Sequence, residues 1–451
     1  MISVSGMRGI VGTDLTPELV VRHAAALGAW AAGNGKPLVV IGRDARTSGP
    51  MFARAAAAGL NSVGVDVIDV GMVPTPTVQL AVEHHRAGAG LIITASHNPI
   101  QWNALKFVGP DGIFLDAAAG AVVRSLAERG PDRASWDRIG SVREDREAIA
   151  RHLDLVVELP EVDVAAIRAK RFHVALDCVR GAGGAVIPEL LERLGCRVSA
   201  INLETDGRFP REPEPIPENL GDLSRLVTES GAQVGMAVDP DVDRLALVDE
   251  FGEAIGEDYT LAFAVRAMGR RLGVAGPKDG KPVVVANLST SLVVEDAARD
   301  LGARFVRSPV GEANVAETIK SENALIGGEG NGGVILPALH IGRDAPLGVA
   351  LILQYLAASG ATVSGAVRSA PRYRIVKSKW PRGKNLDALY SALRSRFPEA
   401  AADTRDGLRL AWTDRWVHVR PSGTEPIIRY IAEAPSEALA RDLIATCQGG
   451  H

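Results

Sequence analysis

The chain has 451 residues, of which 46% are apolar and only 4% are aromatic, and its formal net charge is −4. This length exceeds what one hydrophobic core can organise, and the composition predicts three or four α/β domains rather than aromatic-rich β-sandwiches. Charges of both signs are spread along the chain without a basic tail or stripe, so we expect neither a nucleic-acid nor a membrane partner.

The chain begins with Met1–Gly9, which has no charged segment followed by an apolar core and therefore does not resemble a signal peptide. No apolar stretch reaches the roughly 18 residues of a membrane span. Cys178, Cys196 and Cys447 lie too far apart for a metal or disulfide motif, so we expect reduced thiols. These features predict a cytoplasmic protein.

Strands and helices alternate in the first third of the chain. Strands are predicted at Pro37–Gly42, Gly64–Val70 and Ala89–Ile93, with helices at Met51–Leu60 and Thr77–His84 between them. This alternation is typical of parallel β-α-β units with right-handed crossovers.

The same order of elements recurs twice. The third strand of the second copy is predicted at Ala232–Val238, and that of the third copy at Ala324–Gly327. We infer three similar domains in series, over residues 1–150, 151–252 and 253–367.

The pattern changes after a predicted hinge at Arg368–Pro371. A charged helix at Leu386–Arg396, two strands at Trp416–Arg420 and Ile428–Glu433, and a last helix from Ser436 follow. This order predicts an α+β domain over residues 368–451. The predicted fold is thus three mixed-sheet α/β domains plus an α+β C-terminal domain around a central cleft.

The third strand of each copy ends in an unusual loop, at Thr94–Pro99, Asp239–Arg244 and Gly328–Gly333. Open α/β sheets hold their chemistry at the carboxyl ends of their strands. Three equivalent strand ends of this kind therefore predict a cleft shared by the three domains.

The first loop contains Ser96, which is either the nucleophile of a hydrolase or the carrier of a phosphoryl group. His97 follows directly, but neighbouring loop residues usually point apart, so we expect no direct contact between the two side chains. Lys106 is either a surface lysine or a proton-transfer group that reaches back to the same pocket. Arg8 and the segment Gly42–Arg46 offer further arginines beside glycine turns.

The second loop places Asp239, Asp241 and Asp243 on one face of an extended segment. Three carboxylates at this density repel one another unless a cation lies among them, and oxygen ligands suit Mg²⁺. An EF-hand is excluded because Arg244 occupies the position that requires glycine. A solvated acidic turn is the alternative.

Two more loops carry polar groups. Pro421–Pro426, between Arg420 and Arg429, combines hydroxyls, a glycine turn and guanidinium groups that suit a phosphate, with an ordinary hairpin as the alternative. In the third loop, Glu329 and Asn331 are suited to adjacent sugar hydroxyls, or belong to a structural turn.

These loops, in this order and over nearly the whole chain, resemble those of the α-D-phosphohexomutase family, which includes phosphoglucomutases, phosphomannomutases and phosphoglucosamine mutases. The resemblance implies that Ser96 carries a phosphoryl group that completes a Mg²⁺ site with Asp239, Asp241 and Asp243. It implies that Arg8, His97 and Arg244 steady that phosphate, that Lys106 is the general acid or base, and that Glu329 and Asn331 bind sugar hydroxyls. The implied site for the second phosphate comprises Arg420, Ser422, Gly423, Thr424 and Arg429.

The sequence departs from the family pattern at two loops. Pro240 and Val242 stand where common members have glycines, and Asn331 and Gly333 stand where many have serine and histidine. The third loop, Gly328–Gly333, is called the sugar loop below. Its form, together with Ser3–Gly9, looks more like that of members that act on glucosamine phosphate.

We therefore expect a phosphohexomutase that interconverts hexose 6-phosphate and hexose 1-phosphate, preferably of glucosamine, through phospho-Ser96 and a 1,6-bisphosphate, which also serves as primer. A phosphomannomutase/phosphoglucomutase is the alternative. A serine phosphatase and an inactive sugar-phosphate-binding protein are more distant ones. For the assembly we expect a monomer or homodimer.

Overall fold

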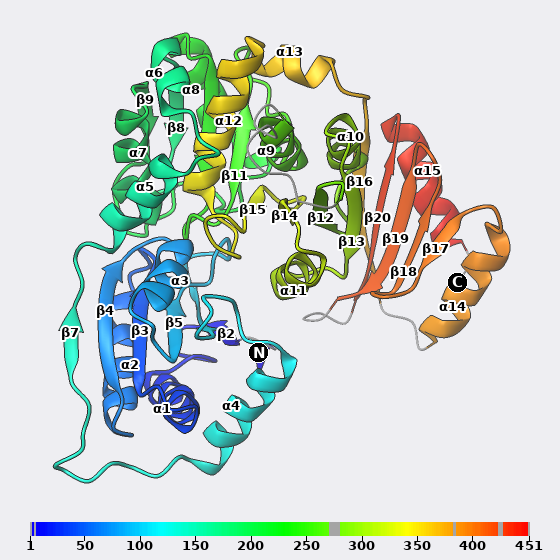
Figure 1. Ribbon diagram of the computed structural model, residues 1–451. Coiled ribbons are helices and arrows are strands. Elements are labelled where there is room, and N and C mark those ends of the chain that lie inside the picture. The colour runs from blue at the N-terminus through cyan, green and yellow to red at the C-terminus, as the bar shows by residue number, and fades with distance from the viewer. Residues whose placement is uncertain (1, 4–5, 270–279, 382–384, 423–426, 450–451) are drawn as a thin grey trace.

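The computed structural model describes the chain except for residues 1, 4–5, 270–279, 382–384, 423–426 and 450–451. Its strands form four sheets that follow one another along the chain, from the blue unit to the red one in Figure 1. The first three sheets are mixed, and the fourth is antiparallel. The predicted fold class is confirmed.

The first sheet has seven strands in the order β1-β2-β6-β5-β3-β4-β7. Its strands are β1 (Ile2–Ser3), β2 (Gly6–Ile10), β3 (Leu38–Arg43), β4 (Asp66–Met72), β5 (Ala89–Ile93), β6 (Trp102–Val108) and β7 (Val142–Glu144). The helices of this unit are α1 (Pro17–Gly33), α2 (Gly49–Asn61), α3 (Thr75–His84) and α4 (Ala117–Arg129).

The second and third sheets have four strands each, in the orders β11-β10-β8-β9 and β13-β12-β14-β15. The second unit comprises α5 (Ala148–Glu158), α6 (Val164–Lys170), β8 (His173–Asp177), α7 (Ile187–Arg193), β9 (Arg197–Ile201), α8 (Gly221–Ser230), β10 (Val234–Val238) and β11 (Leu245–Val248). The third comprises α9 (Asp258–Gly269), β12 (Val283–Asn287), α10 (Leu292–Asp300), β13 (Arg304–Ser308), α11 (Glu312–Glu322), β14 (Ile326–Glu329), β15 (Gly333–Ile335), α12 (Ala345–Ser359) and α13 (Val363–Arg368).

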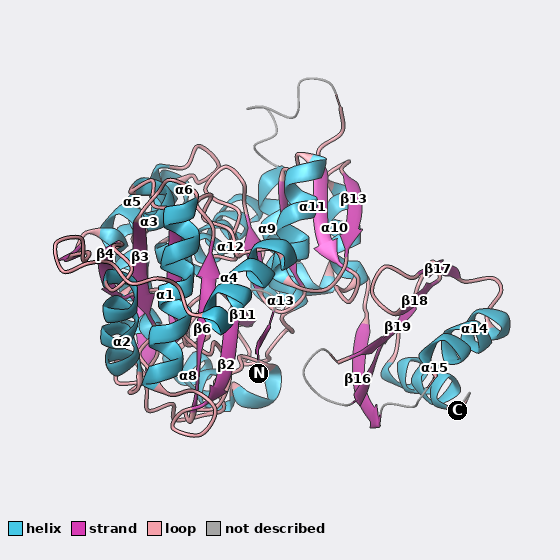
Figure 2. Ribbon diagram, turned by 90° about the horizontal axis from the view of Figure 1, so that it is seen from below, coloured by secondary structure: helices cyan, strands magenta, loops and turns pink. Residues whose placement is uncertain are grey.

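The fourth unit lies to one side of the other three in Figure 2. Its five strands run in the order β16-β20-β19-β18-β17 and carry two helices. The elements are β16 (Arg374–Pro381), α14 (Leu386–Arg396), β17 (Ala401–Asp403), β18 (Leu408–Ala411), β19 (Trp416–Pro421), β20 (Ile427–Ala434) and α15 (Glu437–Gln448). Among the described helices of all four units, none is long and apolar enough to cross a membrane.

The internal repeat appears in the strand order. In each of the first three sheets the third parallel strand lies beside the first, which lies beside the second: β5-β3-β4, β10-β8-β9 and β14-β12-β13. An antiparallel strand, β6, β11 or β15, then pairs with the third. These three strands were not predicted from the sequence, because each returns directly from a polar loop without an intervening helix. Each predicted loop is thus held between two paired strands.

The second and third units share one hydrophobic core. A continuous cluster of buried side chains extends from Leu153 in α5 to Ala370 beyond α13. Helix α12 lies at its centre, between α9 and the pair α5 and α6, and is buried along most of its length. The fourth unit keeps a separate core. The second and third sheets are therefore fixed to each other by apolar packing.

A buried polar network joins the first three units. Asp344 Oδ2 lies 2.8 Å from His152 Nε2 and 3.0 Å from His340 Nε2, and Thr77 Oγ1 of α3 lies 2.8 Å from His152 Nδ1. Burial alone would raise the pKa of Asp344, but the two imidazoles hold it below its usual value. This network sets the position of the first unit against the other two.

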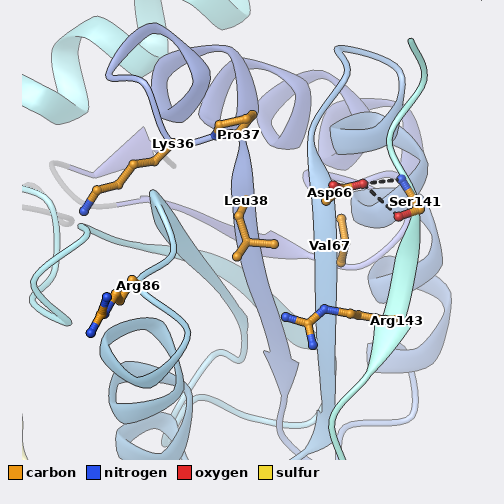
Figure 3. Close-up of a pocket in the computed structure, with 8 residues that line it drawn as sticks. All are labelled: Lys36, Pro37, Leu38, Asp66, Val67, Arg86, Ser141 and Arg143. Carbon is orange, nitrogen blue, oxygen red and sulfur yellow. Dashed lines mark hydrogen bonds between the residues drawn. The ribbon is translucent and has the colours of Figure 1, made fainter. Parts of the chain in front are cut away.

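A pocket of about 390 Å³ lies at the amino ends of β3 and β4 (Figure 3). Lys36, Arg86 and Arg143 line it, and Asp66 Oδ1 there accepts hydrogen bonds from the Ser141 amide and hydroxyl. The three predicted loops follow the carboxyl ends of strands, so this pocket is at the opposite edge of the sheet from the predicted chemistry.

Candidate active site

A cavity of about 1350 Å³ opens where the first three units meet. Five predicted site residues line it, namely Arg8, Ser96, His97, Lys106 and Arg244. The described residues of the fourth unit do not contribute to its lining. The tertiary structure thus brings together residues from the first two predicted loops.

Ser96 lies in the turn after β5, with a backbone φ of +49°, a left-handed conformation that is uncommon outside glycine. Its Oγ donates a hydrogen bond to Asp239 Oδ2 at 3.0 Å and lies 3.2 Å from His97 Nδ1. The expectation that the Ser96 and His97 side chains point apart is therefore wrong. The left-handed turn at Ser96 places both side chains on one side of the loop.

His97 is a weak base in this position. Burial, and then the nearby guanidinium groups of Arg244 and Arg8, hold the pKa of His97 well below its usual value. Its Nε2 lies 3.8 Å from Glu214 Oε1, and the same oxygen is 3.3 Å from Arg244 Nη1. A neutral imidazole of this kind is suited to hydrogen bonding rather than to removing the Ser96 proton.

The Ser96 loop is held by the buried guanidinium of Arg46. Its Nη2 donates to the carbonyls of Ser96 and Asn98, both at 2.6 Å, and its Nη1 donates to those of Pro99 and Trp102 at 2.8 and 2.9 Å. Its Nε donates to a carboxylate of the β3 turn, that of Asp44, at 3.0 Å. Arg46 is 1% exposed, so these carbonyls have lost their water.

Replacing Arg46 by lysine is expected to destabilise the protein by about 3 kcal/mol, because an ammonium group cannot serve four carbonyls and a carboxylate at once. Thermal unfolding followed by calorimetry measures this change. Arg304→Lys is the matched control, since the Arg304 pair with Glu322 is exposed and contributes little. Equal melting temperatures for the two variants would contradict the role given to Arg46.

The second predicted loop, Asp239–Arg244, is called the metal loop below. It holds three buried aspartates whose carboxylate oxygens lie within 4.8 Å of one another, and no other group of possible metal ligands this close occurs among the described residues. Asp239 Oδ1 accepts the backbone amides of Asp243 and Arg244. Val242 has a φ of +61°, a left-handed conformation that glycine adopts readily and a β-branched residue rarely adopts. The loop thus contains a valine at a backbone position that favours glycine.

In each of two aspartates of this loop, one carboxylate oxygen accepts a hydrogen bond and the other accepts none. Asp241 Oδ2 accepts from Thr75 Oγ1 at 2.7 Å, and Asp243 Oδ2 from Arg343 Nη2 at 2.7 Å. Asp241 Oδ1 and Asp243 Oδ1 are buried and lack a hydrogen-bond partner. Burial and the two neighbouring carboxylates raise the pKa of Asp239 well above its usual value. Orphaned buried carboxylate oxygens fit a hard divalent cation.

Lys106, in β6, is not a surface lysine, because its side chain is only 15% exposed. Its Nζ donates to Asp241 Oδ2 at 2.8 Å and lies 3.8 Å from Asp243 Oδ2. Burial alone would lower the pKa of Lys106, but these two carboxylates raise it above its usual value. Lys106 is thus placed between the metal loop and the cavity.

The sugar loop joins β14 to β15. Glu329 is 5% exposed, and its Oε1 accepts from Asn287 Nδ2 at 2.9 Å and from the Gly311 amide at 3.2 Å. Its Oε2 accepts from Arg343 Nη1 at 3.0 Å and from Asn331 Nδ2 at 3.4 Å. The predicted sugar-binding pair is therefore in mutual contact.

The described residues of the predicted phosphate site in the fourth unit do not line the cavity. Arg420 and Arg429 are register partners on β19 and β20, and Ser422, 6% exposed, follows the end of β19. Gly423 and Thr424 lie outside the described residues. Asp406 Oδ2 is 3.0 Å from Arg420 Nε and also accepts the Val310 amide at the cavity rim.

Four residues of this site were given no role from the sequence: Arg46, Glu214, Glu312 and Arg343. The segment Gly42–Arg46 was noted for its arginines, but no partner of Arg46 was predicted. The other three lie in segments without a motif. Their partners are between 14 and 117 residues away, as for Arg343 with Glu329 and Glu214 with His97.

All four units match one protein family. Its α/β/α domains I, II and III match residues 2–132, 150–252 and 256–373, and its C-terminal domain matches residues 376–447. A phosphoglucomutase/phosphomannomutase of Thermococcus kodakarensis is 38% identical, over 97% of this chain and 95% of its own. A probable phosphoglucosamine mutase of Methanopyrus kandleri is also 38% identical, with the same coverage of 97% and 95%.

The fold agrees with this match. The X-ray structure of a phosphoglucomutase/phosphomannomutase family protein from Burkholderia thailandensis has a TM-score of 0.86 and 25% identity, covering 100% of this chain and 97% of its own. The chain therefore belongs to the phosphoglucomutase/phosphomannomutase family, the α-D-phosphohexomutases, and is an enzyme of that mutase class.

Proposed function

We propose that this enzyme interconverts hexose 6-phosphate and hexose 1-phosphate through phospho-Ser96 and a bound hexose 1,6-bisphosphate. The observation that carries the proposal is the 3.0 Å hydrogen bond from Ser96 Oγ to Asp239 Oδ2, inside the carboxylate cluster. A phosphate on this oxygen would lie at the cation site, as a phosphoryl carrier requires.

Asp239, Asp241 and Asp243 would hold Mg²⁺, which when bound offsets the charge on the transferring phosphoryl group. Arg8, His97 and Arg244 line the cavity around Ser96 and would hold the phosphate oxygens. Lys106 Nζ would give a proton to the departing oxygen or take one from the attacking hydroxyl.

The bisphosphate must turn over before its other phosphate returns to Ser96. Glu329 and Asn331 would bind the sugar hydroxyls in both orientations. The second phosphate would be held by the fourth-unit set Arg420, Ser422, Gly423, Thr424 and Arg429. Since the described residues of that unit do not line the cavity, we propose that it moves towards it about the hinge at Arg368–Pro371.

We also propose domain limits of 1–150, 151–252, 253–367 and 368–451. The enzyme is proposed to be cytoplasmic, a monomer or homodimer without nucleic-acid or membrane partners, and to require hexose 1,6-bisphosphate as primer.

Glucosamine phosphate is the proposed substrate, supported by the sugar loop and by the Methanopyrus kandleri relative. The equally similar Thermococcus kodakarensis relative favours a second candidate, a phosphomannomutase/phosphoglucomutase. The two activities differ in the group at the sugar C2, which is an amine or a hydroxyl.

A panel of glucosamine, N-acetylglucosamine, glucose and mannose phosphates, primed with the matching bisphosphates, is expected to give the highest kcat/KM for glucosamine phosphate. About a tenfold margin is expected if one polar contact distinguishes the C2 group. Release of free phosphate in excess of isomerised sugar would indicate a phosphatase. No turnover and no phosphoserine in the intact mass would indicate an inactive sugar-phosphate-binding protein.

A further inference from the structure

One guanidinium group connects the metal loop to the sugar loop. Arg343 Nη2 donates to Asp243 Oδ2 at 2.7 Å, its Nη1 donates to Glu329 Oε2 at 3.0 Å, and its Nε donates to Glu312 Oε2 at 3.0 Å. These carboxylates are each 9% exposed or less as side chains. A planar fork can satisfy three such acceptors at once, which an ammonium group cannot do in the same geometry.

The backbone at Arg343 and at the next residue, Asp344, is held by hydrogen bonds. The Arg343 amide donates to Glu312 Oε1 at 3.1 Å, and the Asp344 amide donates to the Val334 carbonyl at 2.9 Å. Asp344 then caps α12, since its Oδ1 accepts the Leu347 amide at 2.8 Å. The Arg343 side chain is thus held both at its backbone and at its guanidinium group.

The methylene groups of the Arg343 side chain pass close to Gly333 of the sugar loop. A Cβ added to Gly333 would lie 2.3 Å from Arg343 Cδ and 2.8 Å from its Cγ. The next neighbour, Asn331 Oδ1, is 3.2 Å away. Gly333 does not have a left-handed φ, so its lack of a side chain is explained by the passage of Arg343 rather than by backbone strain.

We propose that Arg343 is a positioning residue that holds the sugar-binding Glu329 at a set place relative to the metal ligand Asp243, and that Gly333 is required for it. Without the guanidinium, three buried carboxylates would face one another, and Glu329 would lose the partner that orients its Oε2. The sugar would then bind weakly while the metal loop, held by Lys106, Thr75 and its own amides, would persist. This inference rests on the proposed function for the identity of the ligand.

Binding is tested without turnover, in Ser96→Ala protein, by calorimetry with glucosamine 6-phosphate and by Mn²⁺ titration followed by electron paramagnetic resonance. Arg343→Ala is expected to raise the Kd for the sugar phosphate about tenfold, the effect of one charge-assisted hydrogen bond. It is expected to leave Mn²⁺ binding at least as tight, because a positive charge beside Asp243 has been removed. A general collapse of the site would weaken both.

The matched control is Arg211→Ala. The Arg211 side chain is 9% exposed, as is that of Arg343, but it bonds Asp177 and the Glu212 carbonyl, which belong to neither loop. This control is expected to change neither Kd.

Chemical rescue separates positioning from stability. Arg343 lines the cavity, so added millimolar guanidinium can occupy the space left in Arg343→Ala and is expected to restore the sugar-phosphate Kd to within about threefold of the parent. Urea, which has the same shape without the charge, is expected to have no effect. Guanidinium that restores nothing would overturn the proposal.

Gly333→Ala gives a second test that does not depend on the folding of Arg343→Ala. Alone, it is expected to raise the sugar-phosphate Kd, because the methyl group displaces the Arg343 stem. Added to Arg343→Ala, it is expected to have no further effect.

Full additivity of the two changes, or an unchanged Kd in Arg343→Ala, would overturn the proposal. Failure of the Ser96→Ala parent to bind any hexose phosphate would instead overturn the proposed function.

Discussion

Replacing Ser96 by alanine is expected to reduce mutase activity by about 10³-fold or more, since the proposed mechanism carries the phosphoryl group on the Ser96 hydroxyl. The intact mass of the native enzyme, after incubation with the bisphosphate, should show one added phosphoryl group, and that of Ser96→Ala should show none. The loss should appear in kcat, because the alanine leaves Arg8 and Arg244 in place to bind substrate.

Ser199→Ala is a suitable control, because the Ser199 hydroxyl also contacts a histidine, His173 Nε2 at 2.9 Å, but lies in the second sheet outside the cavity. It should keep full activity. A Ser96→Ala enzyme with native kcat would show that the phosphoryl group takes another route.

Removal of divalent metal is expected to lower activity by a similar amount, about 10³-fold, because Mg²⁺ offsets several kcal/mol of charge in the transition state. Added Mg²⁺ should restore it. Measurement of the rate against buffered free Mg²⁺ gives the Mg²⁺ midpoint, the concentration at which activity is half-maximal. A chelated enzyme that keeps its full rate would contradict the assignment of the aspartate cluster.

Substitution of two comparable aspartates tests whether the Mg²⁺ dependence of the activity comes from the carboxylate cluster. Asp239 and Asp249 are both buried, and each accepts two backbone amides through Oδ1, but only Asp239 belongs to the cluster. Asp239→Asn is expected to shift the Mg²⁺ midpoint at least about tenfold, because one ligand charge is lost. Asp249→Asn is expected to leave the midpoint unchanged.

The elements that the sequence predicted best are those whose signal is local. The strand Ala89–Ile93 and the helix Leu386–Arg396 have the predicted limits, because an apolar run bounded by turn residues and a charged amphipathic segment carry their own pattern. The three strand-end loops were found for the same reason. The antiparallel strands β6, β11 and β15 were missed, since short buried strands after a polar loop have no distinctive period.

The contacts within the site depend on long-range packing. Lys106 meets Asp241 across 135 residues, and Asp243 meets Arg343 across 100. The contact between Ser96 and His97 is short in sequence, yet it was predicted wrongly because it depends on a left-handed backbone turn that Arg46 holds from 50 residues away. No local pattern encodes such a partner.

The sequence by itself determined which residue types stand at each strand end, and in what order, and hence the family and the chemistry that the cleft can perform. Only the tertiary structure decided how those ends are held together. It does so through one core shared by the second and third units and through the buried guanidinium groups of Arg46 and Arg343. The physical reason is that a buried charge must find several acceptors at once, and for these two arginines some of the acceptors come from distant parts of the chain.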